Sequence, residues 1–136
     1  MKVLVIGYGA IGRRHVKNLL ENTNLEIIIY TKRDDLDSLK RKNVKIYRSL
    51  KKCLSEKPDI GFITNETAYH VPIAIKLAKA GLDLFIEKPL SNSMKGVPTL
   101  MQIVKQKKLV TQMGYHLRFH PCIIKMRKLL KQKKIY

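Results

Sequence analysis

The sequence lacks tryptophan, has only two cysteines and contains no long uninterrupted apolar run. A transmembrane helix needs about 20 consecutive, mostly apolar residues, so we expect no membrane span and no membrane partner. Cys53 and Cys122 fit neither a CxxC motif nor a metal-ligand spacing. The chain also starts with a strand-like segment rather than a signal peptide, which favours reduced thiols and a cytoplasmic protein.

Acidic side chains are missing from the last third of the chain. Residues 88–136 hold 12 basic and no acidic residues, and the whole chain has a net charge of +18. This imbalance is typical either of a polyanionic partner or of a chain that lacks an acidic surface belonging to something larger. A basic nucleic-acid-binding protein is therefore an alternative. No known nucleic-acid-binding signature occurs, however, so we expect no specific nucleic-acid partner.

The length of 136 residues and the 45% hydrophobic content fit one folded domain and argue against disorder. Six apolar segments predict strands: Lys2–Ile6, Leu25–Tyr30, Val44–Tyr47, Asp59–Thr64, Leu82–Glu87 and Leu109–Met113. Segments with helical spacing lie between or after them: Ile11–Glu21, Val71–Ala80, Val97–Lys107 and Cys122–Lys134. The alternation predicts an α/β protein, a doubly wound parallel-sheet Rossmann fold with three α-β-α layers in a single domain.

A glycine-rich turn follows the first predicted strand and opens the first predicted helix. It reads Gly7-Tyr8-Gly9-Ala10-Ile11-Gly12, the GxGxxG pattern in the context that makes the pattern informative. The first glycine permits a tight turn and the second lets the backbone approach a pyrophosphate. The third lets the helix pack closely on the sheet, with its N-terminus directed at the phosphates. The six residues therefore predict a dinucleotide-binding site.

The end of the second predicted strand bears on which dinucleotide is bound. An NAD site usually has an acidic residue here for the ribose 2′-OH, whereas this strand runs into Thr31, Lys32 and Arg33. These three side chains could hold a 2′-phosphate through a hydroxyl and charge-assisted hydrogen bonds. Asp34 and Asp35 follow and look like caps for a next helix. We therefore expect NADP or NAD, with NADP slightly favoured.

Further short motifs follow one another along the chain. They are Arg13-Arg14-His15 after the glycine turn, Ile63-Thr64-Asn65 with His70, Ala80-Gly81, Glu87-Lys88-Pro89-Leu90, and Gly114 through Pro121. Together with the glycine turn, this series resembles the glucose–fructose oxidoreductase and inositol dehydrogenase family (Gfo/Idh/MocA). The resemblance implies an NAD(P)-dependent oxidoreductase that transfers a hydride between the cofactor and a hydroxyl of a sugar, nucleotide sugar or polyol.

The resemblance also assigns roles to single residues. Lys88 is implied as the active-site lysine that contacts the reacting hydroxyl, and Glu87 as a neighbour of the nicotinamide ribose. Thr64, Asn65 and His70 are implied to line the nicotinamide side of the cofactor groove. The four histidines show no metal-ligand spacing, so we expect no metal site. His15, on the first helix, is interpreted as structural.

In this family a larger α/β domain follows, carrying the substrate wall, often the oligomer interface, and a second catalytic motif with an Asp and a His. No Asp occurs after Asp83. The resemblance thus implies that residues 1–120 form the NAD(P)-binding domain and that residues 121–136 lead into a C-terminal domain, or partner subunit, absent from this chain. We expect a chain incomplete for catalysis alone that can belong to a homo-oligomer. A non-catalytic NAD(P)-sensing module is the other alternative.

Overall fold

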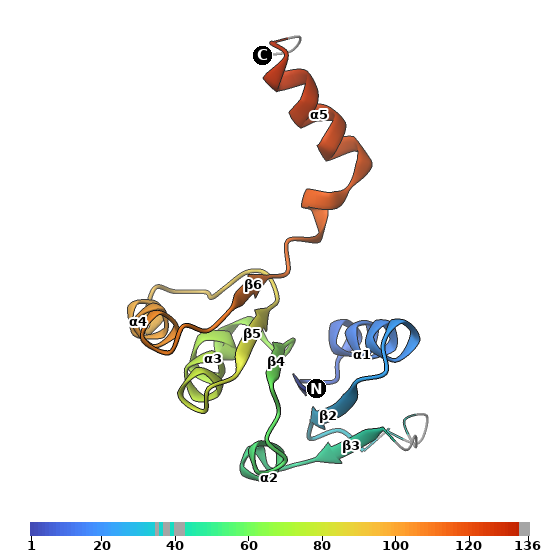
Figure 1. The fold of residues 1–136 in the computed structure, drawn as a ribbon, viewed down its shortest axis with the longest axis vertical. Coiled ribbons are helices and arrows are strands. Elements are labelled where there is room, and N and C mark those ends of the chain that lie inside the picture. The colour runs from blue at the N-terminus through green and yellow to red at the C-terminus, as the bar shows by residue number, and fades with distance from the viewer. Residues whose placement is uncertain (35, 37–38, 40–42, 134–136) are drawn as a thin grey trace.

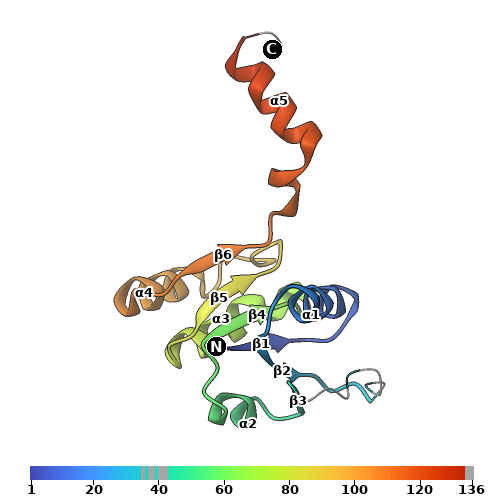
Figure 2. The same ribbon diagram turned by 45° about the vertical axis from the view of Figure 1, so that its right-hand side comes forward.

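One parallel sheet flanked by helices makes up the body of the molecule (Figures 1 and 2). The structure is a computed structural model, and it describes residues 1–34, 36, 39 and 43–133. The strands are β1 (Lys2–Ile6), β2 (Glu26–Tyr30), β3 (Val44–Tyr47), β4 (Ile60–Ile63), β5 (Asp83–Ile86) and β6 (Thr111–Met113). The α-helices are α1 (Ala10–Asn22), α2 (Leu50–Ser55), α3 (His70–Lys79), α4 (Val97–Lys107) and α5 (Pro121–Lys131).

The strands lie in the order β3-β2-β1-β4-β5-β6, and every pair is parallel. The chain runs outward from β1 to β2 and β3, then returns to β4 on the other side of β1. Val5 of β1 therefore pairs with Ile29 of β2 on one side and Phe62 of β4 on the other. This arrangement confirms the predicted doubly wound Rossmann fold, whose ligand crevice lies at the point where the strand order reverses.

Both faces of the central strands are buried, which explains their continuous apolar sequences. On one face, Val3 and Val5 pack with Val16 of α1. On the other, Leu4 and Ile63 pack in a cluster that includes residues of α2, α3 and α4. Helices on opposite faces of the sheet therefore hold β1 and β4 rigidly, and the carboxyl ends of these strands are fixed relative to each other.

Most of the predicted elements differ from the observed ones by one or more residues at an end, and α2 was not predicted. The predicted strand at Leu109–Met113 starts only at Thr111, because the N–H of Leu109 bonds to Val104 and closes the end of α4. The predicted helix Cys122–Lys134 begins at Pro121 and ends at Lys131; Lys134 lies outside the described residues. The predicted strand Leu82–Glu87 is shorter at both ends.

Helix α5 extends away from the sheet (Figures 1 and 2). The segment that leads into it and α5 itself expose six large apolar side chains, which are Tyr115, Leu117, Phe119, Ile124, Met126 and Leu130. No helix among the described residues is long and apolar enough to cross a membrane.

Candidate functional site

A groove of about 740 Å³ opens at the carboxyl ends of β1, β2 and β4, where the strand order reverses. Small-molecule sites typically measure about 300–1,000 Å³, so the groove has the size of a ligand pocket. Ten of the fourteen residues proposed for cofactor binding line it: Gly7, Tyr8, Gly9, Ala10, Ile11, Thr31, Lys32, Arg33, Thr64 and Asn65. Three segments that lie 20 or more positions apart in the sequence thus meet in one place.

The glycine turn is shaped by close approaches at its two outer glycines. Gly7 has φ = +90°, and a Cβ there would lie 2.9 Å from the Cα atom of Asn65. A Cβ on Gly12 would overlap the carbonyl oxygen of Gly7 and lie 2.9 Å from Oγ1 of Thr64. Both positions therefore require glycine for packing of the turn, whether or not a ligand is present.

The middle glycine differs from the other two because a Cβ at Gly9 would meet no atom within 4 Å. Gly9 is also the N-cap of α1, where no side chain forms a capping hydrogen bond and the first turn has no acidic residue. Backbone N–H groups at a helix N-terminus that lack such caps are suited to bind an anion. The open space at Gly9 therefore fits a phosphate group beside the turn.

Thr64 connects the ends of β1 and β4 beneath the groove. Its side-chain hydroxyl lies 2.9 Å from the carbonyl oxygen of Ile6 and 3.1 Å from that of Gly7, and both are acceptors. The residue is 7% exposed. Thr64 therefore holds the glycine turn against the neighbouring strand as well as lining the groove.

The end of β2 supplies a hydroxyl and two basic side chains to the groove wall. Oγ1 of Thr31 accepts a hydrogen bond from the N–H of Arg33 at 3.2 Å, which folds the strand end into a turn around Lys32. Asp34 forms an ion pair with Arg48, and the segment that Asp34 was expected to cap includes residues outside the described ones. Asp35 lies outside the described residues.

Five further residues line the groove that the sequence did not identify, namely Ile6, Tyr30, Glu66, Tyr69 and Ile73. Tyr69 and Ile73 are four positions apart at the start of α3, a spacing that places them on one side of a helix. From the sequence, that spacing could have identified Tyr69 and Ile73 as neighbours on one side of the helix. Glu66 is the one carboxylate among the lining residues and lies in the loop after β4.

Glu87 lies at the end of β5, is 7% exposed, and is not among the residues that line the groove. Its Oε1 atom is 2.7 Å from Nε2 of His15 on α1, and its Oε2 atom accepts the N–H of Lys88 at 3.1 Å. Burial acts to raise the pKa of Glu87. These hydrogen bonds and the charges of His15 and Arg14 outweigh burial and lower the pKa below its usual value. Glu87 is therefore a carboxylate at neutral pH.

His70 and Lys88 also lie outside the lining residues, as does Gly12. The His70 ring is 1% exposed, and both of its nitrogens lie 2.9 Å from carbonyl oxygens, Nδ1 from Pro89 and Nε2 from Asn65. The Lys88–Pro89 peptide bond is cis, and Lys88 is exposed. Direct contact of His70, Glu87 or Lys88 with a cofactor stays a prediction.

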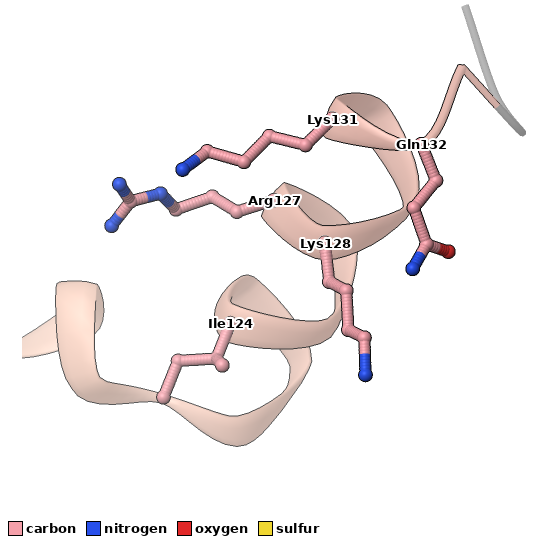
Figure 3. Close-up of a pocket in the computed structure, with 5 residues that line it drawn as sticks. All are labelled: Ile124, Arg127, Lys128, Lys131 and Gln132. Atoms are coloured by element: carbon pink, nitrogen blue, oxygen red, sulfur yellow. The ribbon is translucent and has the colours of Figure 1, made fainter.

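A second hollow lies along α5, lined by Ile124, Arg127, Lys128, Lys131 and Gln132 (Figure 3). Four of the five residues lie on α5, and Gln132 is its C-cap. Arg127 and Lys131 extend to the left in Figure 3 while Lys128 points downward, so the three charges do not converge on one ligand. This hollow is the open surface of a basic helix, and the groove at the glycine turn is the better candidate site.

Comparison with known proteins identifies the family of the chain. Residues 1–115 match the model of the family described as "Oxidoreductase family, NAD-binding Rossmann fold". Myo-inositol 2-dehydrogenase of Thermotoga maritima is 30% identical over 125 residues, which cover 88% of this chain and 37% of that enzyme.

Two solved structures superpose on nearly the whole chain. A probable dehydrogenase from Thermotoga maritima has a TM-score of 0.84 at 28% identity, covering 99% of this chain and 42% of that one. UDP-N-acetylglucosamine 3-dehydrogenase from Acidithiobacillus ferrooxidans has a TM-score of 0.80 at 25% identity, covering 94% and 42%. The chain thus spans about two fifths of the length of each of these three relatives. It belongs to the Gfo/Idh/MocA oxidoreductase family and corresponds to that family's NAD-binding Rossmann domain.

Proposed function

We propose that this chain is the cofactor-binding part of an enzyme that moves a hydride between NAD(P) and a CH–OH group of a polyol, sugar or nucleotide sugar. The observation that carries the proposal is the groove at the strand-order reversal, with the open Gly9 position at the N-terminus of α1. The substrate class is supported by the relatives, which include an inositol dehydrogenase and a UDP-sugar dehydrogenase.

The residues of the groove fit the parts of a dinucleotide. The pyrophosphate would lie against the backbone of Gly9, and the adenosine between the end of β2 and the wall formed by Tyr69 and Ile73. A bound nicotinamide supplies the hydride chemistry. Lys88 would hydrogen-bond the substrate hydroxyl and take part in the transfer of the hydroxyl proton.

A preference for NADP over NAD is part of the proposal. Thr31, Lys32 and Arg33 line the groove at the end of β2, where a 2′-phosphate would lie. Two cations and a hydroxyl favour a dianionic phosphate over a ribose hydroxyl. The carboxylate of Glu66 also lines the groove and would disfavour a phosphate. Glu66 comes from the loop after β4 rather than from β2.

The complete enzyme needs more than this chain. We propose that α5 leads into a further domain or partner subunit that carries the substrate site, and that oligomer contacts lie there too. The exposed apolar side chains of α5 and the acid-free charge of residues 88–136 support this. The unpaired Cys53 and Cys122 support a cytoplasmic location.

Equilibrium titration tests the proposal. NADPH and NADH are added in turn to the chain, and the nicotinamide fluorescence is followed at physiological salt. We expect saturable binding of both cofactors, tighter for NADPH. The same titration with a DNA duplex is the comparison, because electrostatic DNA binding weakens steeply with salt. Salt-resistant DNA binding without cofactor binding would contradict the proposal and favour the nucleic-acid alternative.

A further inference from the structure

Lys88 occupies a turn whose two flanking residues are each bonded to a histidine from a different helix. Glu87, before it, is bonded to His15 of α1, and Pro89, after it, is bonded to His70 at the start of α3. The two helices pack on opposite faces of the sheet, since Val16 of α1 and Ala74 of α3 belong to separate core clusters. The turn is thus held from both sides.

The bond to His15 fixes the main chain before Lys88. An ionised Glu87 can only accept hydrogen bonds, so Nε2 of His15 carries the proton that joins them. The other carboxylate oxygen accepts the N–H of Lys88 itself. The carboxylate also has little room to rotate, because a Cβ on Gly114 would come within 3.0 Å of its carboxyl carbon. His15 thereby controls the backbone of Lys88 through Glu87.

The bonds to His70 fix the main chain after Lys88. The ring reaches the carbonyl oxygen of Pro89 with one nitrogen and that of Asn65 with the other, both at 2.9 Å. The ring therefore spans the main chain of Pro89 and that of Asn65. Asn65 lines the cofactor groove. His70 therefore ties the Lys88 turn to the groove wall.

We infer that His15 and His70 are positioning residues, which together set the backbone at Lys88 and so direct its ammonium group relative to the bound cofactor. The inference rests on the proposed function in one respect, the role of Lys88 in catalysis. Each histidine acts through a neighbour of Lys88.

Amide hydrogen exchange of the ligand-free chain tests the inference without a cofactor. We expect His15→Leu and His70→Leu each to raise the exchange rate of the Lys88 N–H by about tenfold or more, because each substitution removes a side chain whose hydrogen bonds hold the turn. His15→Gln and His70→Gln, which keep an N–H donor, should stay within about threefold of the parent chain. His116→Gln, at an exposed position, is the matched control.

A second readout follows the side chain of Lys88. Lysines are dimethylated with ¹³C-formaldehyde, the Lys88 signal is assigned with Lys88→Arg, and NADP⁺ is added. In the parent chain, the Lys88 signal should shift when NADP⁺ binds. In the two Leu variants, the shift should be less than about half of that in the parent chain, whereas the affinity for NADP⁺ should change by less than about threefold. A variant with a general loss of structure would instead lose NADP⁺ affinity to the same extent as it loses the Lys88 signal shift.

Two results would overturn the inference. One is an unchanged Lys88 exchange rate and NADP⁺ response in both Leu variants. The other is an equal rise in exchange throughout β5, because that shows general loosening rather than control of one turn. Failure of the parent chain to bind any dinucleotide would instead overturn the proposed function, and the exchange experiment would still decide the role of the histidines.

Discussion

The Nε2 atom of His15 and the Oε1 atom of Glu87 lie 2.7 Å apart, although 72 positions separate the residues in the chain. The His15 ring also packs edge-on against the rings of Phe62 and Phe85, with centroids 5.7 and 5.1 Å away. Both partners of the pair are thus largely withdrawn from water. A hydrogen bond to a charge in such surroundings contributes more than one on the surface.

Replacing His15 with leucine should destabilise the chain by about 2 kcal/mol, because Glu87 remains buried without its side-chain donor. His15→Gln, which keeps an N–H donor, should recover about half of the loss. Urea unfolding at pH 7, followed by circular dichroism, measures both values. Equal stability of His15→Leu and the parent chain would show that Glu87 gains nothing from the pair.

The contribution of Glu87 should depend on pH in a defined direction. The pKa of Glu87 is below its ordinary value of 4.5, so folding favours the ionised form. The resulting stability is therefore present above about pH 4.5 and lost as the pH falls through the lowered folded-state pKa. Urea unfolding of the parent chain and of Glu87→Gln between pH 3 and 7 measures it. We expect the difference in stability to shrink below pH 4.5, and a constant difference would contradict this assignment.

Gly9 and Gly12 should respond in opposite ways to the same substitution. Gly9→Ala adds a methyl group to open space at ordinary backbone angles, so the melting temperature should barely change. The methyl group stands where a phosphate would approach, and NADPH affinity should fall by about tenfold or more. Fluorescence titration and thermal unfolding of one sample measure both. Unchanged affinity would place the pyrophosphate elsewhere.

Gly12→Ala is the counterpart. Its methyl group would overlap the carbonyl oxygen of Gly7, so α1 has to move away from the sheet. We expect a loss of about 2–3 kcal/mol of unfolding free energy, as for other overpacked sites, before any ligand is added. Urea unfolding checks this, and full stability of Gly12→Ala would show that α1 is packed less tightly than described.

The fold was predictable from sequence because burial on both faces leaves continuous apolar strands, as in Lys2–Ile6. Helix α2 was missed because it has six residues and only Cys53 of them is buried, too few for a helical pattern. The one local signal was Ser49, whose side chain accepts the N–H of Lys52 as an N-cap. Short helices depend on packing that a sequence pattern does not display.

The site was predictable only in part for a related reason. The glycine turn is local, so its spacing identified it. The pairing of His15 with Glu87 depends on which face of the sheet α1 covers, and the lining role of Tyr69 depends on where α3 starts. Such contacts arise from the order of strands in the sheet, which motifs alone do not state.

Lys32 and Arg33 should decide between the two cofactors. The double variant Lys32→Ala/Arg33→Ala should weaken NADPH binding by about tenfold to a hundredfold and NADH binding by less than about threefold, because the lost bonds are to the 2′-phosphate. The control is the double variant Lys51→Ala/Lys52→Ala, which removes the same amount of positive charge at exposed positions of α2, outside the groove. An equal loss for both cofactors would refute a specific 2′-phosphate contact.

The two cysteines should differ sharply in reactivity. Cys53 is fully buried, and burial raises the pKa of its thiol to about 11, whereas Cys122 is exposed. At pH 8 one thiol should react rapidly with an aromatic disulfide reagent and the other only after unfolding. Cys122→Ser should abolish the rapid phase, and a rapid phase that survives would show that the core around Cys53 opens readily.

The most direct test of cofactor binding is residue-level NMR mapping with NADPH on the ¹⁵N-labelled chain. We predict that the amides of Gly7, Gly9, Thr31 and Lys32 shift most, in a saturable manner, while those of Arg127–Lys131 on α5 do not respond. Shifts confined to α5, or no shift at millimolar NADPH, would contradict the assignment of the groove as a dinucleotide site.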